Sequence, residues 1–138
     1  MSLLQEDTPL LSVRGLCKYF PVLSKGLIRR QIGVVRACHE ISFDLARGET
    51  LGIVGESGSG KSTLARTLLR VTRPTSGSAV FYGEDPVDLA TLSAGELKRI
   101  RPQLQMIFQD PVSSLNPRMT VEQIVGEPLL IHRRARGG

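Results

Sequence analysis

Residues 55–63 read Gly55-Glu56-Ser57-Gly58-Ser59-Gly60-Lys61-Ser62-Thr63, and this stretch decides the fold of the chain. It fits the pattern G-x-x-x-x-G-K-[ST], in which a glycine-rich loop wraps the phosphates of a nucleotide. Glycine permits positive φ and a close approach to a ligand because it has no Cβ. The loop N–H groups and the positive end of a following helix then cradle an anion. The sequence therefore predicts a nucleoside triphosphate site.

Two side chains of this loop have a defined chemical task. Lys61 is expected to reach the β- and γ-phosphates, and the Ser62 hydroxyl is expected to coordinate Mg²⁺. Residues 50–54 form a short apolar run that predicts a buried strand before the loop, and residues 62–70 predict a helix after it. This strand–loop–helix setting favours a phosphate loop over a Gly/Ser-rich surface turn.

Composition and charge bound the class of protein. The chain has 138 residues, of which 41% are hydrophobic and 22% charged, which predicts one globular domain. No apolar run approaches the ~20 residues of a membrane span, and the N-terminus lacks the basic start of a signal peptide. We therefore expect a protein in the cytosol, or docked on a membrane from the cytosolic side.

The basic balance does not indicate a nucleic-acid partner. The net charge is +5, but three arginines fall within the last six residues, and no basic stripe carries aromatic residues for base stacking. Cys17 and Cys38 lack metal-ligand spacing and are expected to be packing residues. His39 and His132 are isolated in the sequence from other ligand types, so no metal-binding role is predicted for them.

The remaining strands follow from the apolar pattern. Residues 10–16 and 78–82 predict strands, and residues 35–45 alternate apolar and polar side chains as a half-buried strand does. Residues 22–34 keep no sustained period and are expected to be an exposed insertion loop. Residues 104–108 (Leu-Gln-Met-Ile-Phe) also predict a strand, and we expect it and the strand at 51–54 to be the parallel strands of the sheet.

Two capping boxes predict the starts of further helices. Ser93 with Glu96 predicts a short helix that stops near Pro102, and Thr120 with Gln123 predicts a second helix. The strand predicted at 104–108 would present Gln109 at its carboxyl end, where nucleotide-binding sheets carry functional groups.

Tyr19 and Phe20 are two adjacent aromatic residues in a chain that has only six. Either one packs and the other is exposed without a role, or one of them stacks on a flat ring such as adenine. The residues themselves leave both interpretations open.

Three segments together resemble the ATP-binding subunits of ABC transporters, and most closely the dipeptide and oligopeptide importers. They are residues 55–63, residues 106–111 (Met-Ile-Phe-Gln-Asp-Pro) and residues 114–121 (Ser-Leu-Asn-Pro-Arg-Met-Thr-Val). The resemblance runs from about residue 10 to residue 132. It implies the fold class: an α/β P-loop NTPase, an incomplete ABC-type nucleotide-binding domain with N-terminal antiparallel strands and parallel core strands.

The resemblance assigns roles to matching positions. Phe20, with Tyr19 as the alternate, resembles the aromatic residue that stacks on adenine. Gln109 resembles the glutamine that senses the γ-phosphate and Mg²⁺, so that Ser62 and Gln109 are the implied metal ligands and Lys61 and Gln109 the implied catalytic residues. The implied ATP-binding residues are Phe20, Gly55, Gly58, Ser59, Gly60, Lys61, Ser62, Thr63 and Gln109.

The resemblance also implies partners, location and domain organisation. The expected partners are transmembrane permease subunits and a second ATP-binding subunit, at the cytoplasmic side of the cell membrane. Residues 10–132 would be the N-terminal part of the ATP-binding domain, with 111–132 as the start of a helical subdomain that docks the permease. Residues 1–9 are expected to be a flexible N-terminus and residues 133–138 a disordered tail.

The sequence departs from the family pattern in two ways. Val112 stands where the peptide-importer branch has an aromatic residue. The Leu-Ser-Gly-Gly-Gln signature, the acidic strand ending in Asp-Glu and the switch histidine do not occur in these 138 residues. The resemblance is therefore to the first half of such a subunit, and it leaves open the transported solute and whether the shortening is biological.

Three functions are considered for a chain with these motifs. The first is the ATP-hydrolysing subunit of a peptide importer. The second is a non-catalytic nucleotide- or partner-binding fragment of that ancestry, and we expect this chain alone, if it folds, to bind ATP weakly without turning it over. The third is an unrelated phosphate-loop kinase or GTPase, which the Gln-Asp-Pro segment at 109–111 disfavours.

Overall fold

The computed structural model describes residues 8–26, 29–110 and 114–132 and divides the chain into two compact units, Met1–Ile100 and Arg101–Gly138. The predictions for residues 1–7, for Val112 and for the tail at 133–138 lie outside the described residues. No helix in the described ranges is long and apolar enough to cross a membrane.

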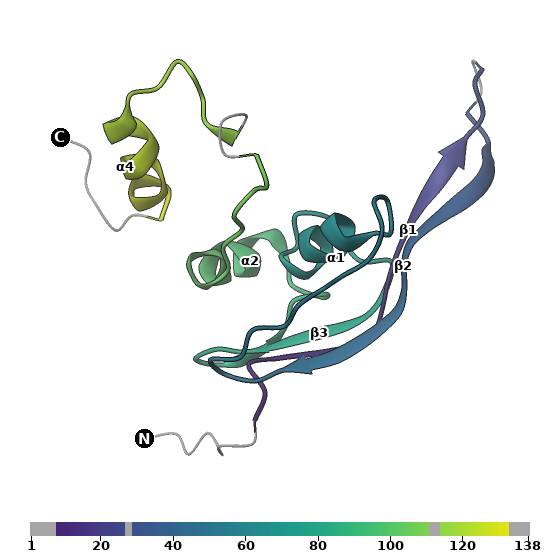
Figure 1. Cartoon of the computed structure of the whole chain (residues 1–138), viewed down its shortest axis with the longest axis horizontal. Coiled ribbons are helices and arrows are strands. Elements are labelled where there is room, and N and C mark those ends of the chain that lie inside the picture. Colours follow the sequence, from purple (N-terminus) through teal and green to yellow (C-terminus); the bar gives the residue numbers. More distant parts are fainter. Residues whose placement is uncertain (1–7, 27–28, 111–113, 133–138) are drawn as a thin grey trace. The chain divides into compact units, whose positions relative to one another are not determined.

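The first unit is built on a four-stranded antiparallel sheet in the order β2-β1-β3-β4 (Figure 1). Its strands are β1 (Leu11–Leu23), β2 (Gln31–Leu45), β3 (Ser76–Tyr82) and β4 (Pro86–Asp88). One helix, α1 (Lys61–Leu68), contacts β1 and β2. The predicted N-terminal antiparallel strands are therefore confirmed, whereas β4 was not predicted.

The core lies on the face of the sheet where the alternating apolar residues of three strands meet. Val13 of β1 is opposite Phe43 of β2 on one side and Ala79 of β3 on the other. Directly opposed residues of antiparallel strands project from the same face, so this row forms one apolar layer. The buried apolar side chains are Val13, Leu16, Cys17, Cys38, Leu64, Ala79, Phe81 and Leu89.

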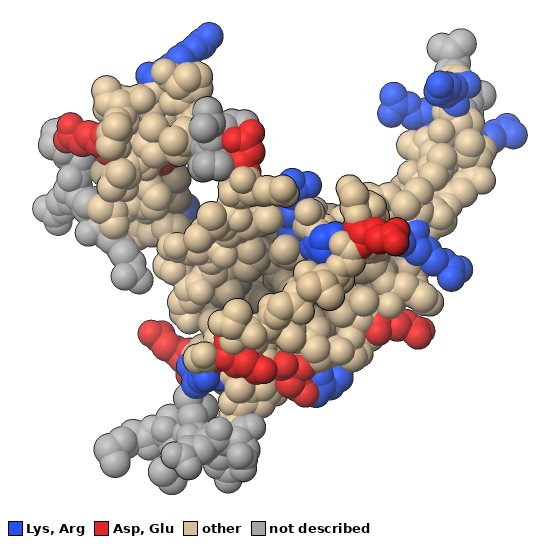
Figure 2. All heavy atoms as spheres, viewed as in Figure 1, with Lys and Arg blue, Asp and Glu red and all other residues tan. Residues whose placement is uncertain are grey.

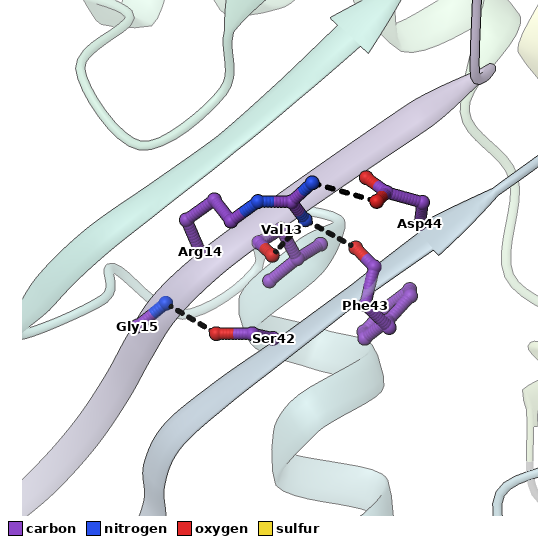
Figure 3. Close-up of polar contacts among 6 residues, drawn as sticks. All are labelled: Val13, Arg14, Gly15, Ser42, Phe43 and Asp44. Carbon is purple, nitrogen blue, oxygen red and sulfur yellow. Dashed lines mark hydrogen bonds and ion pairs between the residues drawn. The ribbon is translucent and has the colours of Figure 1, made fainter. Parts of the chain in front are cut away.

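A bulge in β1 at Arg14 and Gly15 interrupts this regular pattern. The register between β1 and β2 shifts by one residue here, and Gly15 has φ 54°. Its N–H donates to Ser42 Oγ at 2.9 Å, while Arg14 donates to the Phe43 carbonyl at 3.1 Å and to Asp44 at 2.6 Å (Figure 3). Side chains thus replace the ladder bonds lost at the bulge. The guanidinium of Arg14 holds the pKa of Asp44 below its usual range.

Part of segment 22–34, which the sequence predicts as a loop, is strand. The strand β1 runs to Leu23 and β2 begins at Gln31, with Pro21 paired to Val34, Val22 to Gly33 and Leu23 to Gln31. Further register shifts lie along β2, and the last falls between Val22 and Leu23. These irregularities break the period-two pattern in sequence, which is why the prediction of an insertion loop was wrong for the paired residues.

The predicted parallel strands at 51–54 and 104–108 are absent from the described structure, where both segments are irregular. A strand exists only through hydrogen bonds to a neighbouring strand, and every described ladder is antiparallel and involves other segments. The apolar side chains of these segments stay exposed, Val54 at 93% and Ile107 at 96%. Apolar character alone therefore predicted two strands that have no described partner.

The predicted helix starts are confirmed. The helix α2 (Ala94–Ile100) begins after Ser93, whose hydroxyl donates to Glu96 at 2.6 Å and lowers the pKa of that carboxyl. The short 3-10 helix η1 (Arg101–Gln103) follows it and contains Pro102. In the second unit, α4 (Val121–Ile131) starts from a complete capping box of Thr120 and Gln123.

Candidate nucleotide-binding site

The phosphate loop folds as a turn that leads directly into α1. Ser59 N–H donates to the Glu56 carbonyl at 3.2 Å, and Gly58 and Gly60 have φ of 83° and 96°. These values lie in the left-handed region that other residues rarely adopt. A Cβ on Gly58 would meet no atom within 4 Å, so the space beside it is open. The predicted glycine roles thus agree with the local backbone.

Lys61 folds back over its own loop. Its Nζ donates to the carbonyls of Gly55 at 2.7 Å and Glu56 at 2.6 Å, and to Ser59 Oγ at 3.3 Å. All three partners are neutral oxygens, so no described carboxylate compensates the ammonium charge. A cation held in this way at the centre of a glycine-rich loop provides an attractive site for an anion.

The amino end of α1 adds to the same positive potential. Gly60 is the N-cap residue and supplies no side-chain cap, and the first turn contains no acidic residue. The helix dipole is therefore uncompensated at this end and favours an anion. Ser62 is exposed on the first turn, where its hydroxyl is accessible. The Thr63 carbonyl accepts a 2.7 Å bond from Thr67, which is buried against the sheet.

The loop is seated on β2 through the backbone of Gly60. The Sγ of Cys38 lies 3.9 Å from the Gly60 carbonyl oxygen, and Gly60 abuts the carbonyl of Ala37. The sequence did not single out Ala37 as part of the site. Its contribution is a backbone carbonyl, which no side-chain pattern reveals.

Tyr19 and Phe20 have different surroundings in the structure. The ring of Phe20 is 40% exposed, and the ammonium of Lys18 lies 4.7 Å from its centroid. Lys18 pairs with Cys38, and Phe20 is two residues further along β1. Phe20 itself pairs with Val35, beyond a register shift that follows Lys18.

Tyr19 forms a polar cluster with Cys17 and His39. Its hydroxyl lies 2.6 Å from His39 Nδ1 and donates to Cys17 Sγ at 3.4 Å. This bond, together with one from the Glu40 N–H, lowers the pKa of Cys17 to about 7. The bulged pairing of β1 and β2 brings His39, which is distant from Cys17 in the sequence, to 3.9 Å from Cys17 Sγ. Both cysteines are buried free thiols, and within the described ranges no group of three metal-ligating residues occurs.

Gln109 lies in the second unit, on an exposed bend after the irregular segment 104–108. It does not end a strand as the sequence predicted. Its role at the nucleotide stays a prediction. The carbonyl of the neighbouring Asp110 accepts a 2.6 Å bond from the Ser114 hydroxyl.

Comparison with known proteins agrees with this geometry. Residues 38–136 match the family described as ABC transporter. The chain is 47% identical over 133 residues to the oligopeptide transport ATP-binding protein AppF of Bacillus subtilis, covering 96% of this chain and 39% of that protein. It is 50% identical over 125 residues to a putative peptide import ATP-binding protein of Brucella ovis, and the match covers 91% of this chain and 36% of that protein. The glutathione import ATP-binding protein GsiA of Salmonella choleraesuis is 50% identical over 132 residues, and the match covers 96% of this chain and 20% of that protein. The chain thus spans about two-fifths or less of the length of these relatives.

Solved structures share the fold. The ATP-binding cassette MJ0796, in a dimeric post-hydrolysis state bound to ADP and Pi, superposes with a TM-score of 0.70 at 24% identity, over 93% of this chain and 50% of that one. A second dimeric structure of the same cassette gives a TM-score of 0.66. The predicted fold class, an ABC-type nucleotide-binding domain, is confirmed, and the chain corresponds to about half of the solved cassette. Because the family match spans well over half of its residues, this chain belongs to the ABC transporter family.

Proposed function

We propose that the chain is the nucleotide-binding part of an ATP-binding subunit of a peptide importer. The observation that carries this proposal is the ammonium of Lys61, held in a glycine-rich loop by the neutral carbonyls of Gly55 and Glu56. An entering triphosphate replaces these neutral carbonyls with anionic oxygens, which attract the ammonium more strongly because both partners are then charged. The relatives named for peptide and oligopeptide transport support the choice of cargo class.

The rest of the site follows from the loop. The backbone N–H groups at 58–63 bind the phosphates, with Ser59 beside Lys61. Ser62 and Gln109 would hold Mg²⁺, and Phe20 would stack on the adenine. Hard oxygen donors of this kind suit Mg²⁺, which usually keeps several waters and shares phosphate oxygens. When bound, the ion neutralises charge on the β- and γ-phosphates.

The partners and the location are part of the same proposal. The subunit pairs with a second ATP-binding subunit and docks transmembrane permease subunits at the cytoplasmic side of the membrane. The segment from residue 114 to α4 belongs to the docking surface, since α4 leaves the large apolar side chains of Val121, Val125 and Leu129 exposed. Contiguous apolar exposure of this kind is typical of interaction sites.

Calorimetry tests the nucleotide site directly. The full chain is titrated with ATP and Mg²⁺ and, separately, with adenosine, and the titrations are repeated with Lys61→Ala. We expect this substitution to weaken ATP by at least tenfold and to leave adenosine unchanged, because only the triphosphate contacts the ammonium. Lys98→Ala is the matched control, since Lys98 is an exposed lysine of α2. Equal losses for both ligands would show that Lys61 acts through folding, and would contradict the proposal.

A non-catalytic form of this function is the second candidate for the 138-residue chain itself. The acidic strand ending in Asp-Glu does not occur in these 138 residues, and segment 104–108 is irregular, so Gln109 ends no described strand. General acid–base catalysis contributes roughly 10²–10⁴ in rate and requires a base fixed within reach of the water. We therefore infer that this chain binds ATP but does not turn it over. An assay of phosphate release with Mg²⁺ tests this inference.

A further inference from the structure

The hairpin of β1 and β2 extends beyond the rest of the sheet. The last residue of β1 that pairs with β3 is Cys17, opposite Ser76. Past this point the two strands continue alone as a ribbon (Figure 1). We call the described residues 18–26 and 29–36 the basic arm. Its outer end is held by two bonds, from Ser24 N–H to the Arg30 carbonyl at 2.8 Å and from Arg30 N–H to Ser24 Oγ at 3.0 Å.

The charge of the arm has one sign. It carries five basic residues, Lys18, Lys25, Arg29, Arg30 and Arg36, and no residue from 8 to 39 is acidic. Their sum equals the whole net charge of the chain, +5. Figure 2 shows the basic side chains gathered at the outer end of the arm. Lys25, Arg29 and Arg30 form no ion pair with a described carboxylate.

Apolar side chains accompany these charges. Four aliphatic residues near the outer end are exposed, Ile32 at 68%, Val34 at 48%, Leu23 at 44% and Val22 at 39%. They lie on a ribbon with no third strand beside it, so no described element covers them. A basic, acid-free segment with exposed aliphatic side chains is the chemistry that binds an anionic bilayer interface.

We propose that the basic arm is a membrane-contact site, which inserts Leu23 and Ile32 between the headgroups of anionic phospholipids while Lys25, Arg29 and Arg30 pair with the phosphates. A second copy of the arm is a poor binding partner for it, because the five positive charges of one arm would repel the five of the other. Nucleic acid is also a poor binding partner. Tyr19 contacts His39, so Phe20 is the one aromatic residue of the arm that remains for base stacking. The residues proposed to contact lipid, Leu23, Lys25, Arg29, Arg30 and Ile32, are separate from the proposed nucleotide contacts, since neither Phe20 nor any residue of the loop 55–63 is among them.

Vesicle flotation tests the charge. The full chain is mixed with vesicles of phosphatidylcholine alone and of phosphatidylcholine with phosphatidylglycerol, and flotation separates bound from aggregated protein. We expect binding only to the anionic vesicles, falling steeply with added salt. The variant Lys25→Gln/Arg29→Gln/Arg30→Gln should bind about 100-fold more weakly, because each basic residue near such a surface contributes about fivefold. The control Arg66→Gln/Arg73→Gln/Lys98→Gln removes the same charge from exposed positions elsewhere and should bind as the parent chain does.

Tryptophan fluorescence tests the insertion. The chain contains no tryptophan, so Ile32→Trp places a single reporter at the outer end of the arm. Its emission should shift to shorter wavelength on adding anionic vesicles, whereas Val71→Trp, at a site exposed to 57%, should not respond.

Three results would overturn the proposal: equal binding to neutral vesicles, equal loss for both triple variants, or no emission shift from Ile32→Trp. Binding to heparin or RNA without binding to vesicles would likewise replace it with a general polyanion site.

Discussion

Gly60 at the start of α1 lies directly against the backbone of β2 at Ala37. A Cβ built on Gly60 would fall 2.1 Å from the Ala37 carbonyl oxygen, far closer than real Cβ atoms approach. The oxygen belongs to the backbone and a Cβ is fixed directly to it, so no side-chain rotation could relieve this contact. The contact fixes the end of the phosphate loop on the sheet, and it makes Gly60 a structural residue as well as a phosphate-binding one.

Gly60→Ala is therefore expected to destabilise the first unit and to abolish ATP binding. The cost combines the clash with Ala37 and a positive φ of 96°, and strained backbone alone costs about 1–3 kcal/mol. Gly58→Ala is the matched control, since its φ is 83° but its added Cβ meets nothing within 4 Å. Urea denaturation should show a clearly larger loss for Gly60→Ala. Equal losses would mean that the contact with Ala37 relaxes without cost.

Phe20→Ala is expected to weaken ATP and adenosine alike. Stacking of an aromatic side chain on a base contributes about 1–3 kcal/mol, and the triphosphate does not alter that contact. Phe20→Tyr should retain the affinity, because the ring face is kept. Calorimetry with both ligands checks this expectation, and a loss for ATP alone would mean that Phe20 supports the phosphate loop instead.

Tyr19→Phe should leave adenosine binding intact and raise the pKa of Cys17 from about 7 toward its ordinary value of 9.0. The substitution removes the hydroxyl that donates to Sγ, the largest cause of the lowered pKa. The pKa is measured from the thiolate absorbance as a function of pH, for Cys38→Ser and for Cys38→Ser/Tyr19→Phe. An unchanged pKa would assign the effect to the Glu40 N–H, which donates to Sγ at 3.2 Å.

The same thiol makes stability depend on pH. The folded pKa of Cys17 lies below the unfolded one, so the unfolded chain binds more protons between pH 7 and 9. The contribution of Cys17 to the free energy of unfolding is fully present above this window and is lost as pH falls through about 7. Denaturation at several pH values should show this rise in the parent chain and a smaller one in Tyr19→Phe.

Thr120→Ala should fray the start of α4. The substitution removes the acceptor for the Gln123 N–H and with it half of the capping box, a loss of about 0.5–2 kcal/mol in helix stability. Thr120→Ser retains the hydroxyl and should behave as the parent chain. Amide exchange at Gln123 measures the effect, and equal protection in all three proteins would contradict it.

Short-range features of this protein could be predicted from its sequence. The phosphate loop, the helix after it and both capping boxes depend on residues within a few positions of one another, as Ser93 and Glu96 do. Their hydrogen bonds close locally, so the residue pattern contains the whole interaction. The family resemblance added the roles proposed for Phe20 and Gln109, which local chemistry alone leaves open.

Only the tertiary structure decided the features that depend on distant partners. The apolar runs at 51–54 and 104–108 have strand composition but no described ladder, whereas 22–23 and 31–34 pair as strands despite lacking a period. The pairing of β1 with β2 brought His39 to Tyr19, whose hydroxyl lies 2.6 Å from His39 Nδ1. Register and pairing are set by hydrogen bonds between segments far apart in the chain, and a one-residue bulge reverses the face of every side chain beyond it.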